Sequence, residues 1–71
     1  MPLTMVTRGK VQILGVEDGA AGLAARLAPL GILTGAEIEV VRNSAAGPLI
    51  VAVMGSRLVL GRGMAQKIHV R

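Results

Sequence analysis

The stretch Arg26–Val40, RLAPLGILTGAEIEV, contains the change from helical to strand periodicity that decides the fold. Its first part ends an apolar helical face, on which Leu27 and Leu30 are spaced as neighbours on a helix surface. Gly31 is placed to close that helix with a left-handed residue. Glu37–Arg42 then alternates polar and apolar residues, which is typical of a strand with one face in the core.

The residues before this stretch predict a strand followed by a short helix. Lys10–Val16 begins with alternating polar and apolar residues and is interpreted as a strand. The helix is expected to run from Ala20 to Leu30, with Asp18 accepting hydrogen bonds from its first turn. Gly22 and Pro29 keep this helix short, because neither residue favours a helix interior.

The residues after this stretch predict three more short strands and one helical turn. The polar segment 43–48, with its Gly-Pro pair, is typical of a hairpin loop. The strand after it is almost entirely apolar, which is consistent with burial on both faces. A tight turn is expected at Gly55–Ser56. The predicted elements are the strands Leu49–Met54, Arg57–Leu60 and Ile68–Val70, and the helical turn Met64–Gln66.

These elements predict a mostly β fold in one domain, residues 1–71. We expect a small, strongly bent antiparallel barrel of about five strands, with one short helix after the first strand and a helical turn before the last. No cysteine or aromatic residue occurs, while 52% of the residues are hydrophobic. The core must therefore be aliphatic, without disulfides or thiolate metal sites. A chain this small and apolar is also expected to expose an apolar patch, of the kind that marks a partner site or self-association into a homo-oligomer.

The formal net charge of +4 comes from scattered cations, without any basic run. This charge is compatible with an acidic protein, anionic lipid or nucleic acid as partner, but for most of the cations a solvated, mixed surface is the better interpretation. Nucleic acid is not expected as a partner, because no aromatic side chain is present to stack on bases. No apolar stretch approaches the roughly 20 residues that a membrane-spanning helix needs, and the N-terminus lacks the features of a signal peptide. The expected location is cytoplasmic, with membrane contact only through a partner.

The segment Arg26–Val40 resembles the signature of the FeoA family, which has the form RLxxLG(hydrophobic)xxGxxIxV. The resemblance extends over Pro2–Val70, and Thr34 stands where the family often has proline. The matching residues are Leu27, Leu30, Gly31, Gly35, Ile38 and Val40.

The resemblance implies an SH3-like barrel and a small accessory or adaptor protein of bacterial ferrous iron transport. Such a protein would bind and modulate FeoB, the membrane GTPase and iron transporter, at the inner membrane. The same module is found at the C-terminus of metal-dependent repressors of the diphtheria-toxin-repressor type. The alternative is therefore a transition-metal-binding or metal-responsive regulatory module.

The residues offer little for catalysis or for a resident metal. A catalytic nucleophile needs a base and an orienting group nearby, and the chain has one histidine and no cysteine, so no enzyme activity is expected. Glu37 and Glu39 share a strand face at about 7 Å, where a solvated surface is the simpler interpretation. His69 is expected to point to solvent beside Lys67 and Arg71. No cofactor is expected. The alternative is that Fe²⁺ or another divalent cation binds, with His69, Glu37 and Glu39 as the candidate ligands.

A surface for protein contact is the remaining functional hypothesis. The Leu23, Leu27 and Leu30 stripe is interpreted as mostly core. We expect instead an exposed apolar patch with a basic rim, which docks a segment of the transporter. Its predicted apolar residues are Ile32, Leu33, Met54, Val59 and Met64, and its predicted rim is Arg26, Arg57 and Arg62.

Overall fold

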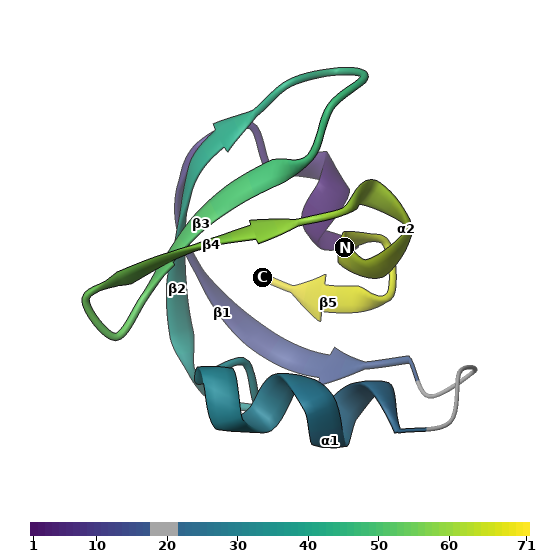
Figure 1. Cartoon of the computed structure of the whole chain (residues 1–71), viewed down its shortest axis with the longest axis vertical. Helices are drawn as coiled ribbons and strands as arrows, with labels where there is room; N and C mark the ends of the chain where they lie inside the picture. Colours follow the sequence, from purple (N-terminus) through teal and green to yellow (C-terminus); the bar gives the residue numbers. More distant parts are fainter. Residues whose placement is uncertain (18–21) are drawn as a thin grey trace.

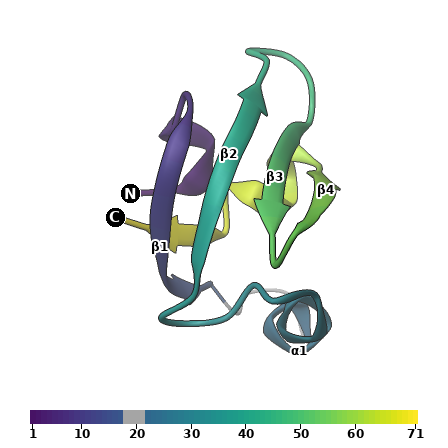
Figure 2. The same ribbon diagram turned by 90° about the vertical axis from the view of Figure 1, so that its left-hand side faces the viewer.

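The chain forms one strongly bent antiparallel sheet of five strands (Figure 1). The computed structural model describes residues 1–17 and 22–71. The strand order in the sheet is β4-β3-β2-β1-β5. Figure 2 shows β1 to β4 side by side, with α1 seen end-on below them. The strands are β1 (Gly9–Val16), β2 (Glu37–Asn43), β3 (Leu49–Val53), β4 (Ser56–Leu60) and β5 (Ile68–Val70).

Four short helical segments connect or flank these strands. A 3-10 helix η1 (Leu3–Met5) precedes β1, and α2 (Arg62–Ala65) connects β4 to β5. The helix after β1 is divided into α1 (Leu23–Leu27) and a 3-10 turn η2 (Ala28–Leu30), which has Pro29 near its start. The predicted mostly β fold, with a helix after the first strand and a helical turn before the last, is confirmed. The sheet bends but does not close, and the predicted Asp18 cap lies outside the described residues.

Gly31 ends η2 in the left-handed conformation, with φ 93°. The Gly31 amide donates to the Ala28 carbonyl at 3.0 Å, and the Ile32 amide donates to the Leu27 carbonyl at 3.2 Å. This pair of bonds is the Schellman motif, in which the residue after the left-handed glycine commonly makes an apolar contact back to the helix. Ile32 is accordingly fully buried, at 0% exposure. The prediction that Ile32 is exposed is therefore wrong.

The strand β3 buries one face and leaves the other half-buried, so the predicted burial on both faces is only partly correct. Leu49, Val51 and Val53 are buried, and the two residues between them are of intermediate burial. Met54 belongs to the turn and not to the strand, since its φ is 50° and that of Gly55 is 81°. The tight turn thus lies one residue earlier than predicted.

The N-terminal residues lie beside the outer edge of β5. The Met1 amino group donates to the Val70 carbonyl at 2.9 Å, and the Val70 amide donates to the Met1 carbonyl at 2.8 Å. Pro2 forms an antiparallel bridge with His69. Leu3 is fully buried behind this contact. One end of the sheet is thereby covered by the chain itself.

The core consists of aliphatic side chains contributed by every strand and by η1, α1 and α2. In the described part of the chain no polar or charged side chain is buried. Burying one Leu, Ile or Val contributes roughly 1.5–3 kcal/mol, so the core supplies the stability that a chain without disulfides needs. The buried residues are Leu3, Val6, Ile13, Leu23, Leu27, Ile32, Ile38, Val40, Leu49, Val51, Val53, Leu60, Ala65, Ile68 and Val70.

Candidate functional site

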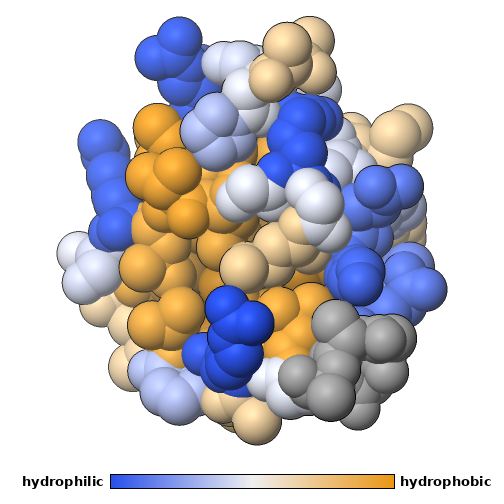
Figure 3. Space-filling view, turned by 45° about the vertical axis from the view of Figure 1, so that its right-hand side comes forward, coloured by the Kyte–Doolittle hydropathy of each residue, from blue (hydrophilic) through white to orange (hydrophobic). Residues whose placement is uncertain are grey.

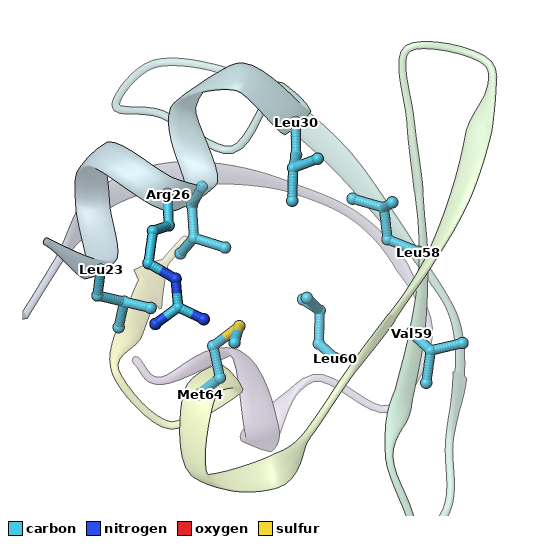
Figure 4. Close-up of a pocket in the computed structure, with 8 residues that line it drawn as sticks. Leu23, Arg26, Leu30, Leu58, Val59, Leu60 and Met64 are labelled. Atoms are coloured by element: carbon cyan, nitrogen blue, oxygen red, sulfur yellow. The ribbon is translucent and has the colours of Figure 1, made fainter.

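An apolar pocket lies between α1 and η2 on one side and β4 and α2 on the other (Figure 4). Its volume is about 200 Å³. Seven of its eight lining residues are apolar, and the eighth is Arg26. The lining residues are Leu23, Arg26, Leu27, Leu30, Leu58, Val59, Leu60 and Met64.

The floor of the pocket is part of the core, whereas its walls reach solvent. Leu23, Leu27 and Leu60 are between 2% and 5% exposed, so they are held by packing. Leu30 is 46% exposed on one wall, and Leu58 and Met64, which point into the pocket from β4 and α2, are partly buried. Val59 also lines the pocket, but its side chain is directed away from it, to the other side of β4 (Figure 4). Apolar side chains therefore meet water at the opening, an arrangement that suits an apolar ligand group.

Arg26 brings the one positive charge into this pocket. Its side chain extends from α1, and its guanidinium points into the space between Leu23 and Met64 (Figure 4). Among the described residues no carboxylate lies within ion-pair distance of it. On the face shown in Figure 3 apolar side chains form a broad patch with charged side chains set among them. The chemistry of the pocket is thus apolar contact plus one cation.

The predicted apolar contact residues divide into three groups. Leu33, Met54 and Val59 are exposed as predicted, at 48%, 86% and 67%. Met64 is partly buried and lines the pocket together with Val59, whereas Ile32 lies in the core. The pocket therefore brings together Val59 and Met64 but not Leu33, Met54 or Ile32. That these five residues contact a partner stays a prediction.

The three predicted rim arginines occupy different environments. Arg26 lines the pocket, and Arg57 is exposed on β4. Arg62 instead faces the protein: its Nη1 donates to Asn43 Oδ1 at 2.7 Å and to two carbonyls of the β2–β3 loop at 2.6 and 3.2 Å. Arg62 therefore makes a structural contact within the protein. This contact was not predicted from the sequence, because Asn43 lies 19 positions away along the chain.

The leucine stripe of the helix also differs from its sequence interpretation. Leu23 and Leu27 are buried as predicted, but Leu30 is not. The chain changes from α-helix to 3-10 helix after Leu27, and the tighter 3-10 winding changes the direction of later side chains. The signal for this change was Pro29, which lies in the first positions of η2.

The predicted metal ligands do not form one cluster. His69 Nε2 lies 2.9 Å from Glu17 Oε2, a contact that the sequence analysis did not predict. Glu37 and Glu39 are exposed on β2. Within residues 1–17 and 22–71 no group of three His, Cys, Asp or Glu side chains is placed to hold a metal ion. Two donors alone fall short of the three or four protein ligands that zinc sites use.

In the described part of the chain, no helix has both the length and the apolar character needed to span a membrane. The bent open sheet, the short helix after its first strand and the apolar pocket define a small SH3-like domain. The sequence matches the FeoA domain family over residues 1–71, and the chain belongs to this family.

Relatives agree with this assignment. The chain is 38% identical over 69 residues to a protein of Methanocaldococcus jannaschii named "Putative Fe(2+) transport protein A", covering 97% of this chain and 83% of the relative. It is also similar to the crystal structure of an iron uptake regulatory protein, FeoA, with a TM-score of 0.84 and 31% identity over 100% of this chain and 95% of the other.

Two further structures extend the comparison of folds. The FeoA protein of Stenotrophomonas maltophilia, crystallised in complex with zinc and described as an SH3 domain protein, matches with a TM-score of 0.82 and 28% identity, covering 100% of this chain and 89% of that one. A manganese-dependent transcriptional repressor matches with a TM-score of 0.88 at 23% identity, over 100% of this chain but 35% of the repressor. The likeness to the repressor concerns the fold alone.

Proposed function

We propose that this protein is an accessory protein of ferrous iron transport that binds and modulates an FeoB-type membrane GTPase and transporter. Membership of the FeoA family supports the role in Fe²⁺ transport. The observation that favours binding as the mode of action is the open apolar pocket, in which Leu30 is exposed and Leu58 and Met64 are only partly buried. Apolar surface of this kind is retained where a partner covers it.

We further propose that the protein acts by contact and not by catalysis. The chain has no cysteine and one histidine, and that histidine is paired with Glu17 at 2.9 Å. A nucleophile with its own base and orienting group would need more such residues. The proposed location is the cytoplasm, where the protein would reach the inner membrane through the transporter.

The proposal is tested with the FeoB-type transporter of the same organism, held in lipid nanodiscs. Immobilised chain should capture the transporter, measured by biolayer interferometry, and should change its rate of GTP hydrolysis. Arg26→Glu should weaken capture, whereas Arg8→Glu makes the same change of charge at an exposed residue outside the pocket and serves as the control. Absence of capture by the unmodified chain would reject the proposed function.

A second candidate function, metal binding, is favoured by the Glu17–His69 contact. An imidazole nitrogen and a carboxylate oxygen 2.9 Å apart are donors that suit zinc or ferrous iron, and a related FeoA protein was crystallised with zinc. Calorimetric titration with Zn²⁺, and with Fe²⁺ under anaerobic conditions, tests this candidate. Heat of binding that disappears in His69→Ala would support it, and the same heat in both proteins would reject this site.

A further inference from the structure

The strand β4 ends the sheet on the side opposite β5. The outer edge of β5 is covered, because Val70 exchanges two hydrogen bonds with Met1. In the described part of the chain no strand lies beside the outer edge of β4. An uncovered edge presents backbone donors and acceptors that another extended chain is able to pair with.

The register of the β3–β4 hairpin identifies which backbone groups face this edge. Met54 and Gly55 form its two-residue turn, both with positive φ, and Val53 lies opposite Ser56. In such a hairpin the pair next to the turn exchanges both hydrogen bonds, and bonded and non-bonded pairs then alternate. Arg57 and Val59 therefore occupy non-bonded positions, so their N–H and C=O groups point away from β3.

Among the described residues, the N–H and C=O groups of Arg57 and Val59 have no backbone hydrogen-bond partner. None of the backbone hydrogen bonds outside the strand ladders involves either residue. Val59 is also 67% exposed, so the edge is reachable from solvent. Two residues that alternate along an edge offer the spacing with which an incoming strand pairs.

The apolar pocket lies directly beside this edge. Leu58 and Leu60 of β4 point into it, whereas the side chain of Val59, between them, is directed to the other side of the strand (Figure 4). Its volume of about 200 Å³ is comparable to the engineered apolar cavity of roughly 150 Å³ that holds benzene. A strand paired with β4 would thus have room beside it for one large apolar side chain.

Charge favours a ligand that carries a carboxylate. Arg26 lines the pocket, while none of the described acidic residues Glu17, Glu37 and Glu39 does. A guanidinium binds a carboxylate through two parallel hydrogen bonds, and such charge-assisted bonds are stronger than those between neutral groups. The net charge of +4 of the whole chain acts in the same direction.

We propose that β4 and the pocket bind an extended acidic segment of another protein by strand addition. The segment pairs its backbone with Arg57 and Val59, places one large apolar side chain in the pocket and sets an Asp or Glu against Arg26. Strand addition of this kind takes affinity from main-chain bonds and specificity from side-chain pockets. The inference rests on the proposed function, since it names the chemistry of the segment that the transporter would supply.

A second copy of this chain fits the same surface less well. Its available edge is β4 itself, with the sequence SRLVL, which contains Arg57 and no acidic residue. Pairing two such edges would leave Arg26 of both copies without a carboxylate from the added strand. The occupant is therefore a different protein.

A library of random twelve-residue peptides displayed on phage tests this inference without assuming any partner. Selection on the immobilised chain should enrich peptides that combine alternating apolar residues with Asp or Glu. Val59→Pro removes one edge donor and should weaken binding of a selected synthetic peptide about tenfold. Val59→Thr keeps the N–H and should bind within about twofold of the unmodified chain, and Arg26→Glu should also weaken binding about tenfold or more.

A readout that needs no substitution accompanies these variants. In the unmodified chain, the Arg57 and Val59 amides should become protected from hydrogen exchange when the selected peptide binds. Enrichment of peptides without acidic residues, equal binding by Val59→Pro and Val59→Thr, or unchanged exchange at both amides would overturn the proposal. A dimer by sedimentation equilibrium that blocks the peptide would also overturn it in favour of self-pairing. Peptide binding without transporter capture would reject the transporter as the partner but would leave strand addition at β4 supported.

Discussion

The Arg62 guanidinium donates a hydrogen bond to the side-chain oxygen of Asn43 at 2.7 Å, which joins α2 to the end of β2. Asn43 in turn donates from Nδ2 to the carbonyls of Thr4 and Val6, at 2.9 and 2.8 Å. One amide side chain thus holds the N-terminal segment, and one guanidinium holds the hairpin loop. These bonds connect three parts of the chain that share no strand ladder.

Asn43→Ala is expected to lower the free energy of unfolding by about 2–3 kcal/mol, because the partly buried carbonyls of Thr4 and Val6 lose the Asn43 donor and Arg62 loses one of its three acceptors. For a domain of this size each 1 kcal/mol corresponds to about 4–8 °C in Tm, so thermal unfolding followed by circular dichroism measures the change. Arg57→Ala, at an exposed arginine, is the control and should stay within about 0.5 kcal/mol. Equal losses in the two variants would contradict the role of the network.

Arg62→Ala should lower stability as well, and its effect should not add to that of Asn43→Ala. The two side chains share a bond at 2.7 Å, and contacting residues in one network couple by about 0.5–3 kcal/mol. Urea unfolding of both single variants and the double variant gives this coupling. Full additivity would show that the bond contributes nothing to stability in solution.

Local periodicity predicted the strands well. The strand Ile68–Val70 has the predicted bounds, and β2 extends the prediction by one residue. Both follow from alternation, which a sequence displays directly. The 3-10 helix Leu3–Met5 was not predicted, because three residues are too few to show a period. Burial of Ile32 was missed for a related reason, since it depends on how the chain turns after Gly31.

The candidate site was predicted only in part, because it joins residues that are distant along the chain. Arg26 and Val59 were both among the predicted contact residues, yet their meeting at one pocket depends on how α1 packs opposite β4. The Glu17–His69 contact joins residues 52 positions apart. Composition indicated that apolar surface would be exposed, but only the tertiary structure shows where it lies.

Gly31→Ala is expected to destabilise the protein by about 2–4 kcal/mol, for two separable reasons. A left-handed backbone costs an L-residue about 1–2 kcal/mol, and the added Cβ would lie 2.7 Å from Val53 Cγ1. Gly35→Ala has the same backbone strain, with φ 90°, but its Cβ would meet nothing within 4 Å. The difference between the two variants in urea unfolding measures the steric part, which buried Val53 is poorly able to relieve. Equal destabilisation would mean that the close approach is absent.

Met54→Asn is expected to raise stability by about 0.5–1 kcal/mol. Met54 has a φ of 50° at the first position of the turn before Gly55, and Asn-Gly is the preferred pair for such a hairpin turn. Little apolar burial is lost, since Met54 is 86% exposed. Met5→Asn is the control, at a residue that is 69% exposed and has no positive φ. It should not raise stability. A lower Tm for Met54→Asn would contradict this reading of the turn.

Leu30 and Leu33 provide a matched pair for locating the partner surface. They are exposed to nearly the same degree, 46% and 48%, but Leu30 lines the pocket and Leu33 does not. Leu30→Ser should weaken transporter capture about tenfold, because an apolar contact worth about 1.4 kcal/mol is lost. Leu33→Ser should leave capture within about twofold. Both proteins should keep their Tm within a few degrees, since neither side chain is buried.

Leu27→Ser completes this series, because it lies in the same pocket but is 2% exposed. It should lower the free energy of unfolding by about 3–5 kcal/mol through a cavity and an added buried hydroxyl. Circular dichroism detects the unfolding of this variant, so loss of capture that accompanies unfolding is distinguished from loss of a contact in the folded protein. Capture lost in Leu33→Ser but kept in Leu30→Ser would place the partner around Leu33 and Met54, and would exclude the pocket beside β4 as the docking surface.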